Sequence, residues 1–304
     1  MALALPPCYA INRIRVPKSR PGRLTMRNKP FEVRPIGGAL GAELHGIDLS
    51  ADLSDETITT VRQALLDHLV IFFRDQALPP DRFLALARRF GSPIEYPFVK
   101  GIEGFPEIIN VAKLEHEQVN FGGVWHSDTT YLQEPPMATL LVARNVPEAG
   151  GDTIFANQYL ALGTLSDTLR AKLANLRGVA SSAKADASRT REDRIRSDGS
   201  ADARKLLVAE HPVVRTHPET GRKALYVNRA HTIAFAGMTE EESAPLLEFL
   251  FSHQIRPEFT CRFRWTPGAL AIWDNRCAQH YAVNDYAGHR RIMQRITLAG
   301  DRPH

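Results

Sequence analysis

The segment VWHSDTTY, residues 124–131, holds a histidine and an acidic residue separated by one position, His126 and Asp128. If the segment is extended, both side chains project to one face about 7 Å apart, because alternate strand residues share a face. The pair could then supply two adjacent metal ligands. A histidine and an acidic residue at this spacing are common by chance, so the pair could instead be two polar residues of a surface turn, and the rest of the sequence has to decide.

A third candidate ligand is His280, in the C-terminal segment WDNRCAQHYAVNDYAGHRRIMQR. If His280 lies on a late strand of a β-barrel that also contains residues 124–131, it would complete a set of two histidines and one carboxylate. This set leaves three coordination positions open and suits non-haem Fe(II). Oxygen chemistry needs such positions, two for a chelating co-substrate and one for O2.

Two arginines follow in the same segment, Arg291 and Arg295, with Met293 between them. In a strand, residues four apart point to the same face. An apolar strand that turns two guanidinium groups inward needs anions there, because unpaired buried charge is very costly. Arginine is also suited to gripping a carboxylate with two parallel hydrogen bonds. The alternative is an outward face with both arginines solvated, but the opposite face is also partly apolar, so we predict a strand packed on both sides.

The elements that would position these residues are helices early in the chain and strands later. Residues 53–70 are predicted to form a helix, with Ser54 as a plausible N-cap and apolar residues at helical spacing, and residues 79–91 a second helix with proline at its start and Gly91 at its end. VIFFRDQ between them reads as a buried strand. Residues 239–255 are predicted to be helical, with Thr239 and Glu242 spaced as a capping box.

From residue 120 onward the chain is rich in predicted strands: residues 139–146, 152–157, 259–265, 269–275 and 290–300. PEAGG, between the first two, has the glycine pair of a tight reversal. FTCRFRW alternates strictly between apolar and polar residues. We therefore expect a barrel or sandwich in one domain over residues 31–304. The charged segment 182–205 is predicted to be a solvated loop or a mobile lid over the site.

The bulk composition excludes several classes of protein. The net charge of +4 arises from residues 1–30, which hold seven Lys or Arg and no acid, so nucleic-acid binding is not indicated. This stretch is expected to be a disordered extension, with Met26 as a possible true start. No apolar run is long enough to span a membrane. Three cysteines without a C-x-x-C motif argue against disulfides and thiolate metal sites and favour the cytoplasm.

The motifs WHSDTTYLQEPPMATLL, GGDTIFAN, HPVVRTHPETGRKALYVN and WDNRCAQHYAVNDYAGHRRIMQRITLAGDRP resemble those of the TauD/TfdA family of Fe(II)- and 2-oxoglutarate-dependent dioxygenases. The resemblance runs from about Phe31 to the C-terminus and is weakest over 182–205. It implies a mostly β fold with peripheral helices and a double-stranded β-helix, or cupin-like jelly-roll, core. It also implies hydroxylation of a C–H bond next to a heteroatom with release of succinate and CO2, and a homodimer or homotetramer.

The resemblance assigns roles to particular residues. His126, Asp128 and His280 match the metal ligands, and the presence of the carboxylate favours hydroxylation over halogenation. Arg291 and Thr153 match the pair that binds the distal carboxylate of 2-oxoglutarate. Arg295 matches an arginine that reaches the anionic group of the substrate.

The substrate region departs from the pattern of taurine enzymes. Tyr96 stands where a sulfonate-binding histidine is found, Gly122 replaces an asparagine, and Tyr131 replaces a phenylalanine. These changes imply a pocket of different shape with less polar recognition of a small ammonium end. Aryloxyalkanoates, larger sulfonates and alkyl sulfate esters are therefore candidates alongside taurine.

Two other functions use the same residues. A mononuclear zinc hydrolase could employ His126, Asp128 and His280 with an activated water, but it leaves Arg291 and Thr153 without a role. A non-catalytic barrel could bind an organic acid as a sensor, although a full ligand triad argues against it. His211 and His217 each precede a proline in a turn context and are expected to be structural.

Overall fold

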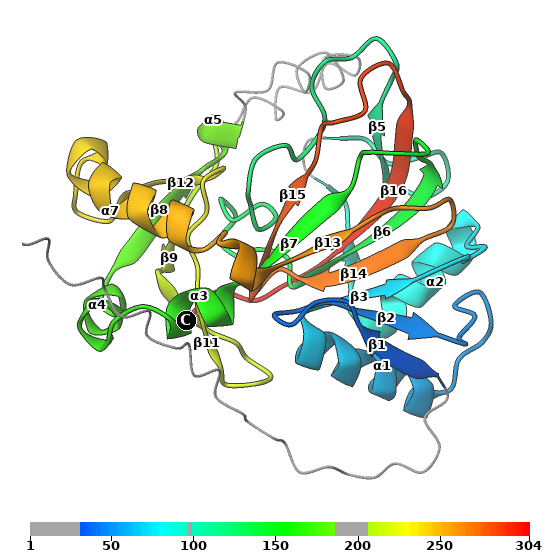
Figure 1. Cartoon of the computed structure of the whole chain (residues 1–304), viewed down its shortest axis with the longest axis horizontal. Helices are drawn as coiled ribbons and strands as arrows, with labels where there is room; N and C mark the ends of the chain where they lie inside the picture. Colours follow the sequence, from blue (N-terminus) through cyan, green and yellow to red (C-terminus); the bar gives the residue numbers. More distant parts are fainter. Residues whose placement is uncertain (1–30, 97–98, 186–205) are drawn as a thin grey trace, which may run out of the picture.

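The computed structural model describes residues 31–96, 99–185 and 206–304. Two β-sheets face each other, and helices cover the outside of the larger sheet and one end of the molecule (Figure 1). The expectation of a mostly β fold with peripheral helices and a jelly-roll core is confirmed. Residues 1–30, and with them the predicted extension, lie outside the described residues, and the assignment of one domain stays a prediction.

The larger sheet carries strands from both ends of the chain. Its order is β1-β2-β3-β14-β6-β16-β4, with β5 also paired to β16, and all pairs are antiparallel except β2 with β3. The bounds are β1 Glu32–Pro35, β2 Ala42–His45, β3 Val70–Phe73, β4 Pro93–Ile94, β5 Ile108–Lys113, β6 Ala138–Asn145, β14 Leu270–Asp274 and β16 Arg291–Leu298.

The smaller sheet that faces it has the order β13-β7-β15, with β7 at Thr153–Asn157, β13 at Thr260–Phe263 and β15 at Ala278–Ala282. A third sheet, β12-β8-β9, and the hairpin β10-β11 lie beside it. Their bounds are β8 Arg177–Ser181, β9 Val208–Pro212, β10 Val214–Thr216, β11 Lys223–Leu225 and β12 Thr232–Phe235. The accompanying helices are α3 Gln158–Gly163, α4 Asp167–Leu173, α5 Ser182–Ala185, α7 Glu240–His253 and the 3-10 turn η3 Pro257–Phe259.

The early helices form as their end signals indicate. Helix α1, Asp55–His68, is capped by Ser54, whose hydroxyl accepts from the Thr57 backbone N–H. Helix α2, Pro80–Phe90, begins with proline and ends at Gly91. Helix α7 has the predicted capping box between Thr239 and Glu242. These helix predictions are confirmed, and α1 and α2 pack on the outer face of the larger sheet.

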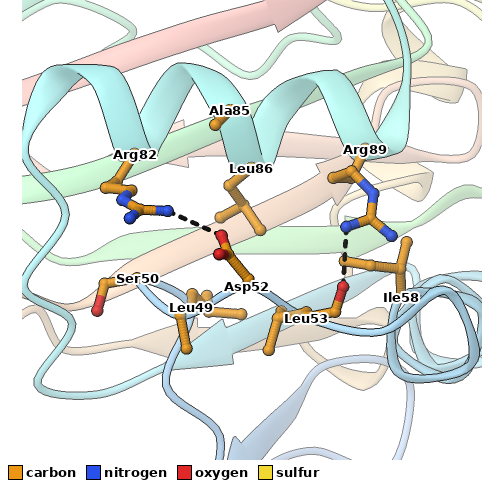
Figure 2. Close-up of a pocket in the computed structure, with 10 residues that line it drawn as sticks. Leu49, Ser50, Asp52, Leu53, Ile58, Arg82, Ala85, Leu86 and Arg89 are labelled. Atoms are coloured by element: carbon orange, nitrogen blue, oxygen red, sulfur yellow. Dashed lines mark hydrogen bonds and ion pairs between the residues drawn. The ribbon is translucent and has the colours of Figure 1, made fainter.

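A surface groove separates α2 from the chain that leads into α1 (Figure 2). Arg82 and Arg89 reach across it from the helix. Arg82 pairs with the Asp52 carboxylate at 2.9 Å, and Arg89 donates to the Leu53 carbonyl at 2.9 Å. Both guanidinium groups therefore have acceptors within the chain, and these two interactions connect α2 to the loop before α1.

Strands β14 and β16 are packed on both faces, as predicted for residues 290–300. Ile296 and Leu298 face the helices, while Met293 faces the core between the two sheets. Arg291 and Arg295 share the parity of Met293 and are 5% and 4% exposed. The prediction that this strand turns both arginines inward is confirmed, so the space between the sheets holds two buried positive charges.

Two local expectations were wrong or only partly realised. The residues on either side of PEAGG do not form a hairpin, because β6 pairs within the larger sheet and β7 within the smaller one. The turn instead carries the chain from one sheet to the other. Within the predicted loop 182–205, Ser182–Ala185 form α5, and residues 186–205 lie outside the described residues.

Among the described residues, no helix is long and apolar enough to cross a membrane.

Candidate active site

Strand β15 and the segment before β6 bring His126 and His280 together. Their backbones form an isolated antiparallel bridge, in which His126 N donates to His280 O at 3.1 Å and His280 N donates to His126 O at 2.8 Å. The extended geometry expected for residues 124–131 ends here. Asp128 begins a turn, and Thr129 has a positive φ of 41°. The turn, rather than strand alternation, brings the carboxylate back beside the histidines.

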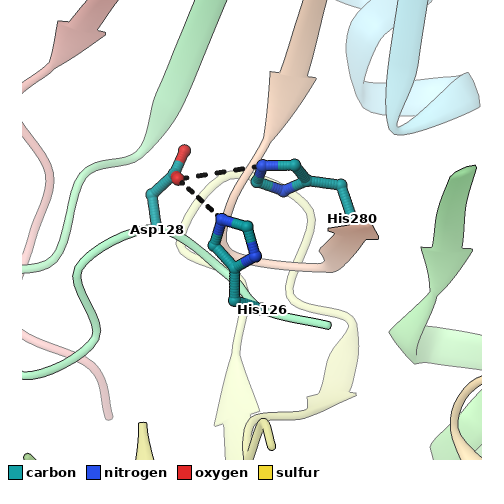
Figure 3. A group of neighbouring side chains, drawn as sticks. All are labelled: His126, Asp128 and His280. Carbon is teal, nitrogen blue, oxygen red and sulfur yellow. Dashed lines mark ion pairs between the residues drawn. The ribbon is translucent and has the colours of Figure 1, made fainter. Parts of the chain in front are cut away.

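The three side chains converge on one point between the sheets (Figure 3). Asp128 Oδ1 lies 3.6 Å from His126 Nε2 and 3.9 Å from His280 Nε2. All three residues are buried, and their candidate ligand atoms lie within 4.8 Å of one another. Residues from two distant parts of the sequence thus supply two nitrogen ligands and one oxygen ligand to a single candidate metal site.

The protonation of the histidines fits metal binding. His126 Nδ1 lies 2.7 Å from the Val124 carbonyl, which can only accept, so Nδ1 carries the hydrogen and Nε2 presents its lone pair to the centre. Burial, with a contribution from His126, lowers the pKa of His280 well below its usual value. The His280 imidazole is therefore neutral, which is the form in which histidine binds a metal ion.

Charge at the centre is set by Arg295. Burial favours the neutral form of Asp128, but the positive charge of Arg295 opposes it, and the pKa of this carboxyl lies well below its usual range. Arg295 Nη2 lies 3.0 Å from Asp128 Oδ1 without the direction of a hydrogen bond. Nε and Nη2 of Arg295 find no hydrogen-bond partner among the described residues. The guanidinium thus retains donors for an anion next to the triad, while Tyr96 packs on its face with the ring centroid 5.2 Å from Cζ.

A second buried cation lies four residues earlier on the same strand. Arg291 Nε donates to the Gly151 carbonyl at 3.1 Å, and its Nη2 has no partner within the described part of the chain. Burial lowers the pKa of this guanidinium from its usual value. Thr153 lines the same pocket, and its Oγ1 accepts from Trp265 Nε1 at 2.9 Å. An orphaned guanidinium donor beside a hydroxyl is a site that a carboxylate would satisfy.

One pocket contains the whole arrangement, and its remaining walls are apolar. It is lined by His126, His280, Thr153, Arg291 and Arg295 together with Val111, Phe121, Gly122, Leu141, Trp273 and Ala282. Gly122 has φ +84°, and a Cβ there would lie 3.2 Å from His126 Cε1, so a side chain would press on the histidine. The glycine keeps the wall beside His126 open.

The other two substrate residues predicted from the sequence are not among the residues that line the pocket. Tyr96 contacts Arg295, as above, and Tyr131 packs against His231 with ring centroids 5.0 Å apart. His231 in turn lies 6.1 Å from the His126 ring, centroid to centroid. The sequence had given no reason to place His231 here. It follows no spacing pattern with the triad, and only the fold brings it close.

A second group of metal-ligating types, His217, Asp274 and Cys277, has its atoms fully engaged. His217 Nδ1 accepts from the backbone N–H groups of Glu219 and Thr220, so Nε2–H donates to Asp274 Oδ2 at 2.9 Å. Asp274 also accepts two hydrogen bonds from the Arg276 guanidinium. Burial raises the pKa of the Cys277 thiol well above its usual value. The group is a charge-balanced hydrogen-bond network, in keeping with the structural role expected of His217.

Comparisons with known proteins agree with this geometry. Residues 32–297 match the family described as "Taurine catabolism dioxygenase TauD, TfdA family". An alpha-ketoglutarate-dependent sulfate ester dioxygenase of Pseudomonas putida is 36% identical, over 90% of this chain and 91% of that protein. An alkylsulfatase of Acinetobacter baylyi is 35% identical, over 89% of this chain and 86% of its own length.

The fold has solved counterparts as well. The crystal structure of a taurine dioxygenase from Burkholderia xenovorans superimposes with a TM-score of 0.75 at 36% identity, covering 90% of each chain. The chain belongs to the TauD/TfdA family. It is a 2-oxoglutarate-dependent dioxygenase (alpha-ketoglutarate is the same compound) that uses Fe(II) and O2.

Proposed function

We propose that this TauD/TfdA-family dioxygenase hydroxylates the carbon next to the heteroatom of an alkyl sulfate ester or of a sulfonate with an apolar chain. The observation that carries the proposal is the pair of buried arginines with unmet donors beside the His126, Asp128 and His280 centre. One organic anion would bind to Arg291 and a second to Arg295. An oxidation with two anionic reactants, the co-substrate and the substrate, needs both arginines.

Each residue then has a defined task. His126 Nε2, His280 Nε2 and Asp128 Oδ1 hold Fe(II), leaving coordination positions for co-substrate and O2. Arg291 and the Thr153 hydroxyl bind the distal carboxylate of 2-oxoglutarate. Arg295, supported by Tyr96, fixes the anionic group of the substrate so that the neighbouring carbon faces the metal, and Tyr131 shapes this region through His231.

Bound Fe(II) supplies the oxidation: 2-oxoglutarate becomes succinate and CO2, one oxygen atom of O2 enters succinate, and the other enters the C–H bond as hydroxyl. The residues confine this event, since the centre is buried and the arginines orient both anions. With a sulfate ester, the hydroxylated carbon loses its hydroxyl proton and forms a carbonyl. The C–O bond to sulfate then breaks, and sulfate leaves with the electron pair.

The lining of the pocket favours an apolar chain over taurine. None of the described residues that line the pocket is acidic. The nearby carboxylate of Asp128 is assigned to the metal, so an ammonium group would have no carboxylate partner in the pocket. Val111, Phe121 and Leu141 instead offer apolar contact. The two sulfate-ester relatives support the same choice.

The test is succinate release from 2-oxoglutarate with alkyl sulfates, alkylsulfonates, aryloxyalkanoates and taurine, in air and under argon. We expect release in air with alkyl sulfates above taurine, and none from His126→Ala or His280→Ala. Arg291→Ala is expected to raise the KM for 2-oxoglutarate about 10- to 100-fold, since it removes hydrogen bonds to a charged group. Arg290→Ala, at the exposed neighbouring position, is the matched control. Zinc-dependent turnover under argon would establish a hydrolase instead.

We also propose that the enzyme is a cytoplasmic homodimer or homotetramer. Cys261 and Cys277 are free thiols, which suits a reducing compartment. Light scattering on the purified protein measures the assembly.

A further inference from the structure

The two oxygens of the Asp128 carboxylate have different surroundings. Oδ1 faces His126, His280 and Arg295. Oδ2 points the other way and accepts a hydrogen bond from Thr139 Oγ1 at 2.7 Å. Only one oxygen is therefore directed at the centre where the metal would lie.

The direction of the Thr139 hydroxyl is fixed by Asn275. Trp273 Nε1 donates to Asn275 Oδ1 at 2.9 Å, and the Asp128 backbone N–H approaches the same oxygen at 3.3 Å. Both groups can only donate, so they identify the amide oxygen of Asn275 and leave its Nδ2 to donate to Thr139 Oγ1 at 3.0 Å. Thr139 thus accepts from Asn275 and must direct its own hydrogen at Asp128.

The fold holds this chain of hydrogen bonds rigidly. Thr139 is paired with Trp273 across neighbouring strands β6 and β14, and Asn275 follows directly after β14. Thr139, Asn275 and Asp128 are all 2% exposed or less. Buried and fully satisfied networks of this kind favour one geometry, because breaking any one link leaves an unpaired polar group.

We propose that Thr139, oriented by Asn275, is a positioning residue that restricts Asp128 to one-oxygen coordination of Fe(II). This inference rests on the proposed function, in which Asp128 is a metal ligand. A carboxylate that bound through both oxygens would take one of the three positions that 2-oxoglutarate and O2 need. Engaging Oδ2 in a hydrogen bond with Thr139 keeps that position open.

The test compares substitutions at Thr139 with a matched control. Thr139→Val removes the hydroxyl at nearly constant volume, Thr139→Ala removes it without the risk of overpacking, and Thr139→Ser retains it. Thr297→Val is the control, because Thr297 lies directly opposite Thr139 on β16, on the same inward face, and is also buried.

The first readout is the visible absorption band of the anaerobic Fe(II)–2-oxoglutarate complex, titrated with 2-oxoglutarate. We expect Thr139→Val and Thr139→Ala to need about tenfold more 2-oxoglutarate for half-saturation or to lose the band, as partners of metal ligands typically contribute that much. Thr139→Ser and Thr297→Val should titrate like the unsubstituted enzyme. The second readout is a crystal structure of Thr139→Val with Mn(II), in which Asp128 should bind through both oxygens.

The inference would be overturned by wild-type titration of both hydroxyl-free variants, or by one-oxygen coordination in the Thr139→Val crystal. An equal defect in Thr297→Val would also do so, since the effect would then belong to core packing. Asp128→Ala distinguishes a failure of the proposed function from a failure of the positioning role of Thr139. If it binds Fe(II) as tightly as the wild type, the proposed function fails. If it loses Fe(II) while the Thr139 variants behave normally, only the positioning role fails.

Discussion

At the scale of single residues, Trp265 connects the two groups that we assign to 2-oxoglutarate. Its Nε1–H donates to Thr153 Oγ1, and its ring lies 5.8 Å from Arg291 Cζ. An indole nitrogen can only donate, so Thr153 must accept from it and has its own hydrogen left for a carboxylate. The tryptophan therefore orients the hydroxyl before the co-substrate arrives.

Trp265→Phe should weaken 2-oxoglutarate binding about fivefold, the usual effect of one neutral hydrogen bond. Titration calorimetry under argon with the Mn(II)-loaded enzyme measures it. In a Thr153→Val background the same substitution should have no further effect, because no hydroxyl remains to be oriented. Trp125→Phe, whose ring stacks on Tyr281 instead, serves as the control. Additive losses in the double variant would mean that Trp265 acts through packing alone.

At the scale of elements, what the sequence predicted well was local. The alternation of apolar and polar residues in FTCRFRW predicts that one face of β13 is buried, and Cys261 and Phe263 are buried as this pattern predicts. The turn at Asp128 and the separation of β6 from β7 were missed. The turn places a threonine, Thr129, at positive φ, which local propensity disfavours, so the residue types there do not indicate the turn. Thr139 carries no motif at all, because its partner Asn275 lies 136 residues away.

The turn after β14 is anchored by Asp274. Burial opposes its ionisation, but hydrogen bonds from Arg276 and His217 hold the pKa of Asp274 below its usual value. A carboxyl with a lowered folded-state pKa stabilises the fold above its unfolded pKa, about 3.9, and loses this contribution as the pH falls below that value. Asp274→Asn should therefore lower the free energy of unfolding by about 3 kcal/mol at pH 7, as expected for a broken buried ion pair.

Urea unfolding at pH 7, 4 and 3 tests this, and the difference between the two proteins should shrink below pH 4. Asp52→Asn, which breaks a surface pair with Arg82, should have little effect at any pH. A difference that stays constant down to pH 3 would show that the charge of Asp274 is not what stabilises the turn.

At the scale of the whole molecule, the candidate site joins the two sheets. His280 and Thr153 belong to the smaller sheet, whereas Arg291 and Arg295 belong to β16 of the larger one. Metal and co-substrate would therefore bind across the interface between the sheets. A ligand that binds only the closed sandwich stabilises it by mass action.

Two cysteines report on that interface. Cys261 and Cys277 are buried in the core between the sheets, and burial raises the pKa of the Cys261 thiol to about 12. The thiolate is the reactive form, so at pH 8 both should resist iodoacetamide until the sandwich opens. In a Cys8→Ser variant under mild urea, mass spectrometry should find both cysteines labelled at one common rate. Mn(II) with 2-oxoglutarate should slow that rate, and slow it less in Arg291→Ala. Fast labelling of Cys261 alone, insensitive to both ligands, would mean that β13 opens independently and that the ligands do not hold the sheets together.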